Sequence, residues 1–523
     1  MKKSFLILLI AACFAVQAQT IHVSGDQTGV WDADTVLVTG NVSVMDSLRI
    51  LPGTVVLFDG FYKIDVRKGS TFVAQGTERD SIFFTVADTT GFHNYNSKKG
   101  GWNGLRLSKA GHFLMDYCVL EYGKAFLDSV WNGGALDVVN SDDVHVHHST
   151  MHHNAAHKRG GAVSGIDSKL EMTDCSMHHN TVVDTIDYFI YGGAASFLKC
   201  DVELRGIEFR ANDGSLCVGG ALSLDSCSVV LDRSVFVDNL GVNGGGLYLM
   251  RSNDRDCKFS NLLFDDNYSV HFGGGFAVSD AAPEISNILV INNRSYGVSC
   301  CGIFFYGQCE PVLRNCIVYH NYPGYDDPMT DTTQMWVWTT DDFGPEFYHC
   351  LIEGGLRYIH SPENVKAFED ILDVDPMFVN EEMHDFHLVE GSPCINAGDP
   401  NTPQYVLDGM DLDGWYRVSN QRIDIGPYEY SGEAVSELSS VSFAKLIGNP
   451  LGAHSRIEFD RAMEGEVTLS VYAIIGRCMV EKTLNLKGSQ SFAMDELAEK
   501  LVPGVYLIAL RHGNEVCTLK AVK

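Results

Sequence analysis

The sequence predicts an all-β solenoid, a parallel β-helix, on three observations. A phrase made of an Asn, a short spacer and a Gly-Gly pair recurs through the middle of the chain, as in "DNLGVNGGG" and "DNYSVHFGGG". The steps between these Asn residues are 26, 32, 27, 28, 26 and 28 residues, and the residues are Asn154, Asn180, Asn212, Asn239, Asn267, Asn293 and Asn321. Short runs rich in Val, Leu, Phe and Tyr separate the phrases, and almost nothing before Glu363 has the pattern of an amphipathic helix. Units of this size cannot fold alone, so they stack on one another.

Residues 1–18 come first and are typical of a secretory signal peptide, with two lysines, an apolar run and the small-residue site Val16-Gln17-Ala18. Ile10-Ala11-Ala12-Cys13 also fits a lipoprotein cleavage site, although the apolar run before it is short and apolar residues follow it. No later apolar run is long enough to span a bilayer. We therefore expect an exported, soluble mature chain.

We expect each repeat unit to form one coil of the solenoid. In "GGALSLDSCSVVLDRSVFVDN" apolar and polar residues alternate in three short segments, which gives three strands per coil joined by bends. Strands of successive coils then pair at about 4.8 Å. We expect the Asn to take the left-handed conformation at one bend and to bond the Asn of the next coil. The Gly-Gly pair supplies a second bend, where a Cβ would meet the neighbouring coil.

From roughly Ile21 to Tyr430 the sequence resembles the right-handed parallel β-helix proteins of the pectin-lyase-like superfamily, and among them surface proteins of the polymorphic outer membrane protein type. "LPGTVVLFDGFYKIDVRKGSTFVAQGTERDSIFFTV" and "GGWNGLRL" resemble their entry coils. "DPMFVN", "DFHLVEGSPCINAGDP" and "DLDGWYRVSNQRIDIGPYEY" resemble their closing segment, at about residues 370–430. The resemblance implies a right-handed parallel β-helix over residues 19–430 and says little about chemistry.

The tail is expected to form a second domain, residues 441–523, after a small polar linker at 431–440. Its markers are Asn449-Pro450, Val471-Tyr472, Gly476-Arg477 and Pro503-Gly504-Val505-Tyr506. At these markers the tail resembles the C-terminal sorting domain of the type IX secretion system. The resemblance implies a small β-sandwich, contact with the type IX secretion machinery, and attachment to surface lipopolysaccharide on a Bacteroidota-type outer membrane. An ordinary immunoglobulin-like module is the alternative.

The charge is concentrated in the repeat body. Without residues 1–18 the chain has 36 basic and 67 acidic residues, whereas residues 441–523 hold 10 basic and 9 acidic residues. Such a body repels nucleic acid and anionic membranes and attracts cations, so we expect no nucleic-acid partner.

Fourteen cysteines follow residue 18, and in an exported protein they could form disulfides. Cys200, Cys227 and Cys309 each lie 12 residues before the Asn of their unit. This spacing predicts columns of buried thiols that pack as small apolar residues. A disulfide at Cys300-Cys301 or between stacked neighbours remains open.

Histidines recur in the same way. "MHHN" occurs twice, so stacking would bring His152 beside His178 and His153 beside His179. A Zn²⁺, copper or nickel ion could then be held between the imidazoles. A solvated polar ladder beside the Asn column explains the same repeat without a metal.

Acidic residues suggest a catalytic hypothesis. Polysaccharide cleavage needs two carboxylates flanking the bond, or a base near a neutralised uronate. Asp238 aligns with Asp266 one coil on, and Asp265 lies beside it. The nearest basic candidates are Arg210, Arg233 and Arg294. None of these residues lies in a lyase or hydrolase motif, and acids before such an Asn are typical of solvated turns.

Two other places could bind ligands. Trp336 and Trp338 share one face if they lie on a strand, and packing onto the solenoid is the alternative to sugar binding. The residues that would complete a sugar-stacking platform are Tyr322, Tyr325, Asp341 and Asp342. Near the closing segment, Asp411, Asp413 and Asp424 could hold Ca²⁺, although "DLDG" lacks the later ligands of a calcium loop.

The leading hypothesis is a secreted β-helix protein displayed at the cell surface, with a non-catalytic role in adhesion, ligand binding or envelope architecture and a carbohydrate or host-surface ligand. The rival is a polysaccharide lyase or glycoside hydrolase, which rests on analogy with the fold. A deep groove at Asp238, Asp265 and Asp266 would favour the enzyme. A flat face of solvated acids would favour the rod.

Overall fold

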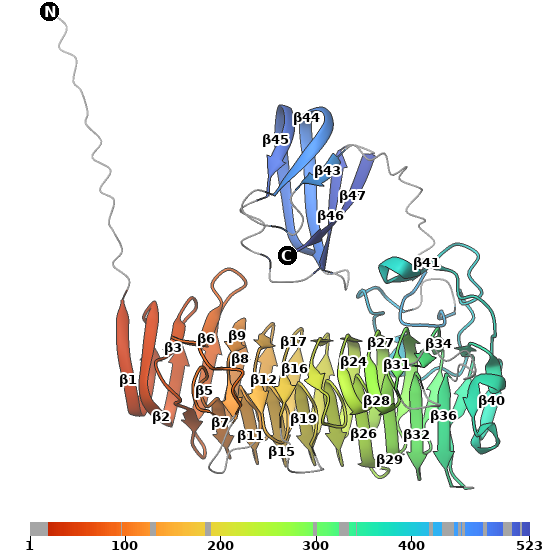
Figure 1. The fold of residues 1–523 in the computed structure, drawn as a ribbon, viewed down its shortest axis with the longest axis horizontal. Helices are drawn as coiled ribbons and strands as arrows, with labels where there is room; N and C mark the ends of the chain where they lie inside the picture. Colours follow the sequence, from red (N-terminus) through yellow and green to blue (C-terminus); the bar gives the residue numbers. More distant parts are fainter. Residues whose placement is uncertain are drawn as a thin grey trace, which may run out of the picture.

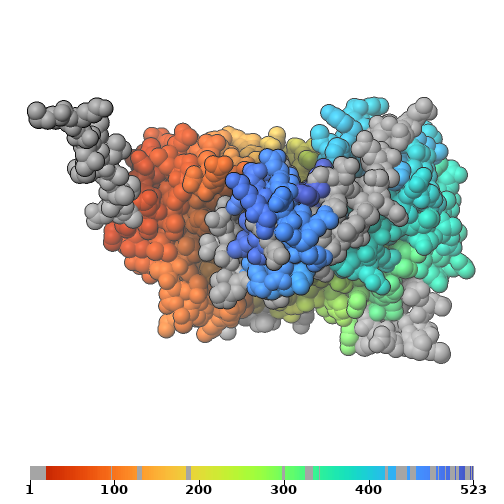
Figure 2. All heavy atoms as spheres, turned by 90° about the horizontal axis from the view of Figure 1, so that it is seen from above, coloured from red at the N-terminus to blue at the C-terminus, as the bar shows by residue number. Residues whose placement is uncertain are grey.

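The computed structural model describes residues 19–523, except 96, 126–131, 184–189, 297–300, 324–333, 341, 418–421, 431–443, 448–450, 452–454, 474–477, 495–500, 502–504 and 513–514. The predicted signal peptide and linker therefore lie outside the described residues. The body is a parallel β-helix whose coils follow one another in chain order from β1 (Thr20–Trp31) to β40 (Ala367–Glu369) (Figure 1). Seen from above, it is an elongated body along which the colours change in sequence order (Figure 2).

Each repeat coil contributes three strands, and each strand pairs in parallel with its counterpart one coil on, which confirms the predicted β-helix. The first column follows β2 (Thr35–Ile50) and consists of β4 (Ile64–Val66), β7 (Leu105–Ser108), β11 (Leu136–Val139), β15 (Val163–Ile166), β19 (Ala195–Leu198), β23 (Leu222–Asp225), β26 (Leu247–Ser252), β29 (Phe276–Ala281), β32 (Ile303–Gly307), β36 (Met335–Thr339) and β39 (Ile359–His360). The second column consists of β5 (Thr71–Gln75), β8 (His112–Asp116), β12 (Val144–His147), β16 (Lys169–Thr173), β20 (Asp201–Arg205), β24 (Ser228–Val237), β27 (Cys257–Asp265), β30 (Glu284–Ile291), β33 (Val312–Arg314), β37 (Glu346–Tyr348) and β40.

The third column runs beside the second, and the long strands β24, β27 and β30 turn the corner and belong to both. Its other members are β3 (Val55–Phe58), β6 (Ile82–Val86), β9 (Cys118–Glu121), β13 (Thr150–His152), β17 (Ser176–His178), β21 (Glu208–Arg210), β34 (Ile317–Tyr319) and β38 (Leu351–Ile352). A separate sheet of short strands follows the same bend in successive coils, directly after the Asn in every strand but the first, and consists of β10 (Lys124–Ala125), β14 (Ala155–Ala156), β18 (Thr181–Val182), β22 (Asp213–Gly214), β25 (Leu240–Asn243), β28 (Tyr268–Phe272), β31 (Arg294–Ser295) and β35 (Tyr322–Pro323).

The seven Asn residues form a buried ladder. From Asn180 to Asn321, the side-chain oxygen of each accepts the backbone N–H and the amide N–H of the Asn one coil before; from Asn212 to Asn239 these distances are 3.1 and 2.9 Å. The first rung differs, because the side-chain oxygen of Asn154 accepts the backbone N–H of Gly123 at 2.8 Å. The last rung is different, because Asn321 donates to the side-chain oxygen of Gln334 at 2.7 Å. The predicted hydrogen bond between coils is therefore present.

The predicted backbone conformation of the Asn residues is wrong. The left-handed residue at each bend is the one before the Asn, and these residues are His153, His179, Ala211, Asp238, Asp266, Asn292 and His320. Their φ angles lie between 46° and 58°. Turning the chain one residue early directs the Asn side chain into the solenoid, where its amide reaches the next coil and a backbone carbonyl.

The Gly-Gly pairs close the opposite bend as expected. Gly244 has φ 65°, a backbone conformation that favours glycine. At Gly245 a glycine is required for a different reason, because there is no room for a side chain. A Cβ on Gly245 would lie 2.2 Å from the carbonyl oxygen of Gly274 in the next coil. The coils therefore pack here backbone against backbone.

Inside the coils, aliphatic and aromatic side chains form one continuous core. Phe209, Phe236 and Phe264 stack from coil to coil with ring centroids 4.8 and 4.7 Å apart. The predicted Cys column is present at Cys200 and Cys227, where the backbone N–H of the first donates to the sulfur of the second at 3.4 Å. Serines take the same role in other coils, since the hydroxyl of Ser168 accepts the N–H of Ser141. These thiols fill corner positions that suit a small side chain able to accept a hydrogen bond.

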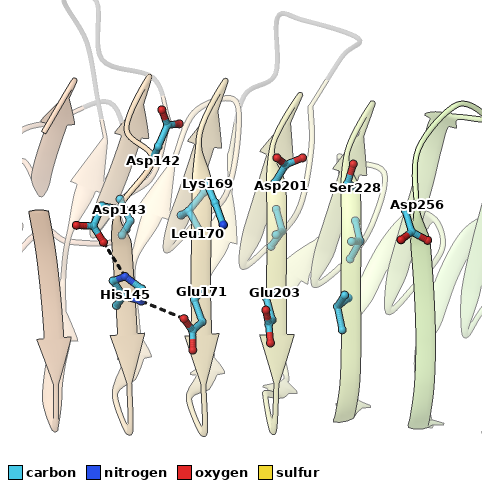
Figure 3. A pocket seen from close by; sticks show the side chains of 14 residues that line it. Asp142, Asp143, His145, Lys169, Leu170, Glu171, Asp201, Glu203, Ser228 and Asp256 are labelled. Atoms are coloured by element: carbon cyan, nitrogen blue, oxygen red, sulfur yellow. Dashed lines mark hydrogen bonds and ion pairs between the residues drawn. The ribbon is translucent and has the colours of Figure 1, made fainter. Parts of the chain in front are cut away.

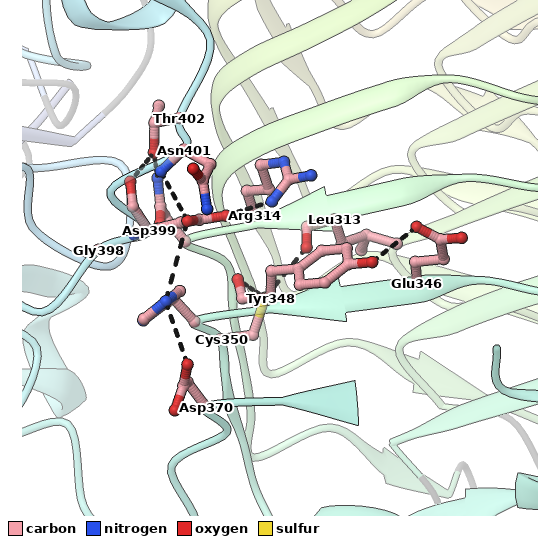
Figure 4. Close-up of polar contacts among 12 residues, drawn as sticks. Leu313, Arg314, Glu346, Tyr348, Cys350, Asp370, Gly398, Asp399, Asn401 and Thr402 are labelled. Carbon is pink, nitrogen blue, oxygen red and sulfur yellow. Dashed lines mark hydrogen bonds and ion pairs between the residues drawn. The ribbon is translucent and has the colours of Figure 1, made fainter. Parts of the chain in front are cut away.

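The closing segment folds back along the outside of the third column. It contains β41 (Phe378–Asn380), η3 (Glu381–Met383), β42 (Asp385–Leu388) and α1 (Gln404–Leu407), whereas η1 (Gly355–Tyr358) and η2 (Pro362–Asn364) lie in the last coil, beside β39 and β40. Its apolar residues cover an apolar stripe on the outer face of the third column, made of Val235, Val237, Leu263, Leu289, Ile291, Ile317 and Leu351. Polar contacts surround this docking surface: Arg314 pairs with buried Asp399, and its guanidinium lies 4.3 Å from the Tyr348 ring centroid (Figure 4).

The tail is a separate antiparallel sheet with its own core. Its strands are β43 (Ala444–Ile447), β44 (Arg456–Ala473), β45 (Cys478–Ala493), β46 (Val505–His512) and β47 (Glu515–Val522). This agrees with the predicted small C-terminal β domain. Of its predicted sequence markers, Val471 and Tyr506 are buried in the sheet, while Asn449-Pro450, Gly476-Arg477 and Pro503-Gly504 lie outside the described residues.

Among the residues that the structure describes, no helix has the length and apolar character needed to cross a membrane.

Candidate functional site

The histidine and carboxylate candidates lie on successive coils of one edge. In the third column, His152 pairs with His178, His178 with Arg210, and Val237 with Asp265. The left-handed residues of the same bends include His153, His179, Asp238 and Asp266. What looks in the sequence like two unrelated sites is therefore one edge, which changes from imidazoles to carboxylates as the coils advance.

The four histidines stack as the sequence predicts. The rings of His152 and His178 are 4.9 Å apart and nearly parallel, and those of His153 and His179 are 5.2 Å apart. Within each coil the two Nδ1 atoms approach each other, at 2.8 Å between His152 and His153 and at 3.0 Å between His178 and His179. Burial lowers the pKa of His152 to about 4 and that of His178 to about 3, so this tetrad is neutral near pH 7.

Asp265 is not a solvated turn residue but a buried strand residue, 2% exposed. Its Oδ2 lies 2.6 Å from Nδ1 of His384 in the closing segment, and its Oδ1 accepts the amide of Asn292 at 2.9 Å. The hydrogen bond with Asp265 raises the pKa of His384. No repeat spacing relates these two residues, because His384 lies outside the repeats.

A groove of about 380 Å³ opens beside this contact. It is lined by Asp266, Asn292, Arg294, Glu381, Glu382 and His384. Asp238 lies on the edge with much of its surface open to solvent, and partial desolvation of its carboxyl by the surrounding chain, together with the charge of Asp266, raises its pKa. Arg233 is not among these lining residues; it lies at the bend inside β24 and contacts Asp232. Arg210 pairs with Glu208 on its own strand, and Arg294 lies 4.0 Å from Asp266.

Trp336 and Trp338 lie on the outer face of β36 and stack, with centroids 5.1 Å apart. The neighbouring strand β32 adds aromatic rings at the same registers, Phe304 beside Trp336 and Tyr306 beside Trp338. We call Phe304, Tyr306, Trp336 and Trp338 the aromatic patch. Trp338 is 51% exposed and Tyr306 is 44% exposed, with their rings edge to face at 5.8 Å.

The other predicted members of that platform do not join it. Tyr322 lies on β35 in the sheet of short strands, where its ring stacks near His320. Asp342 is exposed, and Tyr325 and Asp341 lie outside the described residues.

The predicted calcium ligands have protein partners. Asp411 and Asp424 are buried, and their carboxylates accept backbone N–H groups, from Trp415 and Glu429 to Asp411 and from Asn396 and Tyr430 to Asp424. Asp413 instead contacts Nε2 of His387 at 2.6 Å. Metal binding at this place stays a prediction.

A second groove, of about 430 Å³, runs across the outer face of the second column (Figure 3). His145 of β12 and Glu171 of β16 face each other in register, and Nδ1 of His145 lies 3.1 Å from the Glu171 carboxylate. His147 lies on the same face, two residues on. The signal was present in the sequence, because Glu171 follows His145 by 26 residues, the local coil period.

Comparison with known proteins supports the fold. Residues 199–326 match the family model described as the right handed beta helix region. No curated protein matches the chain. The matched residues lie in the middle of the solenoid, so the match and the coil geometry together identify this region as a right-handed parallel β-helix.

Proposed function

We propose that this protein is a surface-displayed β-helix that binds carbohydrate without cleaving it, and that the aromatic patch is its binding site. The observation that carries the proposal is the exposure of Trp338 and Tyr306 side by side on a rigid sheet. Exposed apolar side chains that form one contiguous patch mark interaction sites more often than side chains exposed singly. The flat faces of these two rings suit the apolar faces of sugar rings.

The rest of the molecule favours this reading of the patch. Phe304 is buried and Trp336 is half-buried beside the exposed pair on the same face, so the platform needs little ordering when a ligand binds. Asp280 and Gln308 lie at the end of the neighbouring strands, where the N–H of Gln308 donates to Asp280. The acidic body repels polyanions, so we expect a neutral glycan.

The test is a glycan array followed by affinity measurements on purified chain. We expect binding to a neutral glycan that falls at least tenfold in Trp338→Ala and in Tyr306→Ala. Trp415→Ala is the matched control, because Trp415 is 68% exposed in the closing segment, outside the patch. Unchanged binding in both patch variants, or release of reducing ends or unsaturated products from the glycan, would overturn the proposal.

Polysaccharide cleavage is a second candidate function, favoured by the buried Asp265–His384 contact beside a groove. A histidine held by a buried carboxylate is a suitable general acid or base, and Asp266 and Arg294 lie in the same groove. If this groove is the active site, the native chain should cleave a polysaccharide, and His384→Gln and Asp266→Asn should each lose that activity. Turnover unaffected by both variants would exclude this groove as the site.

We also propose export by the signal peptide and display at the outer-membrane surface through the C-terminal sheet, with the type IX secretion machinery and surface lipopolysaccharide as partners. The support is the set of sequence markers in residues 1–18 and 441–523. Fusing residues 431–523 to an exported reporter in a bacterium that has type IX secretion tests it. Reporter retained in the periplasm would contradict the proposal.

A further inference from the structure

The outer face of the second column carries a cluster of metal-binding side chains that lies away from the aromatic patch. His145, His147 and Glu171 each present one ligand atom, and these three atoms lie within 4.8 Å of one another. The two histidines project from the same face of β12 because residues two apart on a strand share a face. Glu171 comes from the next coil, in register with His145.

The separation of the ligand atoms suits a single ion. Two ligands held at about 2.0 Å by one tetrahedral Zn²⁺ lie about 3.3 Å apart. Nδ1 of His145 and the carboxylate oxygen of Glu171 are 3.1 Å apart. The His145 and Glu171 side chains are 32% and 41% exposed, so an ion between them would keep open positions for water or for a ligand in the groove.

Second partners already hold both imidazoles in place. Nε2 of His145 lies 2.8 Å from the carboxylate of Asp143, which leaves Nδ1 to face Glu171 (Figure 3). Nδ1 of His147 lies 2.6 Å from the hydroxyl of Thr173, which leaves Nε2 available. A carboxylate or hydroxyl on the far nitrogen is the usual way in which a zinc-binding histidine is oriented.

The charge of the groove also favours a cation. Among the described lining residues Lys169 alone is basic, and the acidic ones are Asp142, Asp143, Glu171, Asp201, Glu203 and Asp256. A divalent ion would offset part of this negative charge.

We propose that His145, His147 and Glu171 bind Zn²⁺. The tetrad of His152, His153, His178 and His179 is the less suitable place, because its Nδ1 atoms approach each other only in pairs. Among the described residues, the cluster on β12 and β16 is the one group that brings three His, Cys, Asp or Glu ligand atoms within 4.8 Å of one another. Two imidazoles with nitrogen ligands and one carboxylate form a donor set that suits zinc.

The test is titration of the metal-free full chain with Zn²⁺ by calorimetry, and with Co²⁺ by visible absorption. We expect one high-affinity site per chain, weakened at least tenfold in His147→Ala and in Glu171→Gln. Glu203→Gln is the matched control, since Glu203 occupies the register of Glu171 one coil further on and pairs with Arg205. His178→Ala tests the tetrad.

Thermal unfolding of the metal-free variants shows whether they fold. Because the substituted side chains are half-exposed, we expect the unfolding temperature of each variant to equal that of the native chain. Zn²⁺ affinity that is unchanged in His147→Ala and Glu171→Gln would overturn the proposal. Affinity lost in His178→Ala alone would also overturn it and place the ion at the tetrad.

Discussion

Asp265 and His384, which are 119 residues apart in the chain, share a contact of 2.6 Å between a buried carboxylate and an imidazole. Asp265 belongs to a solenoid strand, and His384 ends the 3₁₀ turn η3 of the closing segment. The charges of Asp266 and Asp238 also favour the protonated imidazole. The contact therefore holds the closing segment against the most acidic part of the edge.

This contact makes docking of the closing segment depend on pH. The pKa of His384 is raised from 6.5 by the Asp265 hydrogen bond, and contacts with Asp385 and Asp413 raise the pKa of His387 to about 10 in spite of burial. His384 stabilises the docked state, whereas His387 stabilises the closing segment itself, since Asp385 and Asp413 both belong to that segment. Each contribution is complete below about pH 6.5, the ordinary pKa of histidine, and is lost as pH rises through the raised pKa of that histidine. We expect hydrogen-exchange protection of residues 370–430 to fall several-fold between pH 6.5 and 10.

The control for that measurement is the double variant His384→Gln, His387→Gln. Its protection should be weaker at pH 6.5 and nearly independent of pH above it. Equal pH dependence in the variant and the native chain would contradict the assignment to these two histidines.

Asn239→Ala should destabilise the solenoid by about 3 kcal/mol or more. The substitution removes the acceptor of the Asn212 N–H and amide, and it leaves the carbonyl of Phe209 without the Asn239 amide. Each buried group left without a partner costs about 1–3 kcal/mol. Denaturant unfolding measures the change, and Asn253→Ala at an exposed position should cost less than about 1 kcal/mol. Similar losses in both variants would show that the ladder contributes little.

Gly245→Ala should cost about 3 kcal/mol or prevent folding, because its Cβ would meet the backbone carbonyls of Gly274 and Tyr268. Gly414→Ala is the comparison that distinguishes a steric clash of the added Cβ from strain of the backbone. Gly414 has φ 86° with open space around its missing Cβ, so its substitution should cost only about 1–2 kcal/mol. Thermal unfolding compares the two, and an equal shift would mean that space between the coils is not the constraint at Gly245.

Asp424→Ala should loosen the closing segment by about 2–4 kcal/mol, since its carboxylate accepts the N–H groups of Asn396 and Tyr430 at 2.6 Å. If Asp424 serves the backbone rather than an ion, adding Ca²⁺ or EGTA leaves the unfolding temperature of the native chain unchanged. A saturable rise in that temperature with Ca²⁺ would instead support the calcium site suggested by the sequence.

The repeats made most of the fold predictable, because the strands and bends assigned to one coil apply at the same positions in the next coil. The periodic Asn and Gly residues marked both bends, and the repeated "MHHN" placed His152 beside His178 correctly. The preference of Asn for left-handed backbone misled the assignment of the bend. The ladder requires the Asn to point inward, so the left-handed residue precedes it and takes identities as different as Ala211 and His153.

The position of the closing segment was harder to predict, because no sequence period relates this segment to the strands that it covers. One signal was present. The outward residues of the third column are polar at Ser176 and His178, and they become Val235 and Val237 two coils later. A strand whose two faces are both apolar is typically covered on both sides. This change marks where the closing segment lies, although it cannot tell which histidine meets Asp265.

Each rung of the Asn ladder between Asn180 and Asn293 offers its neighbours the same donors and the same acceptor. A whole coil could therefore be duplicated or deleted in the section around Asn180 without changing what the coils on either side bond to. The section after Val235 lacks this freedom, because its outer apolar residues are matched to one closing segment of fixed length. The number of coils can thus vary in the section around Asn180, whereas the coils after Val235 and the closing segment that covers them can change only together.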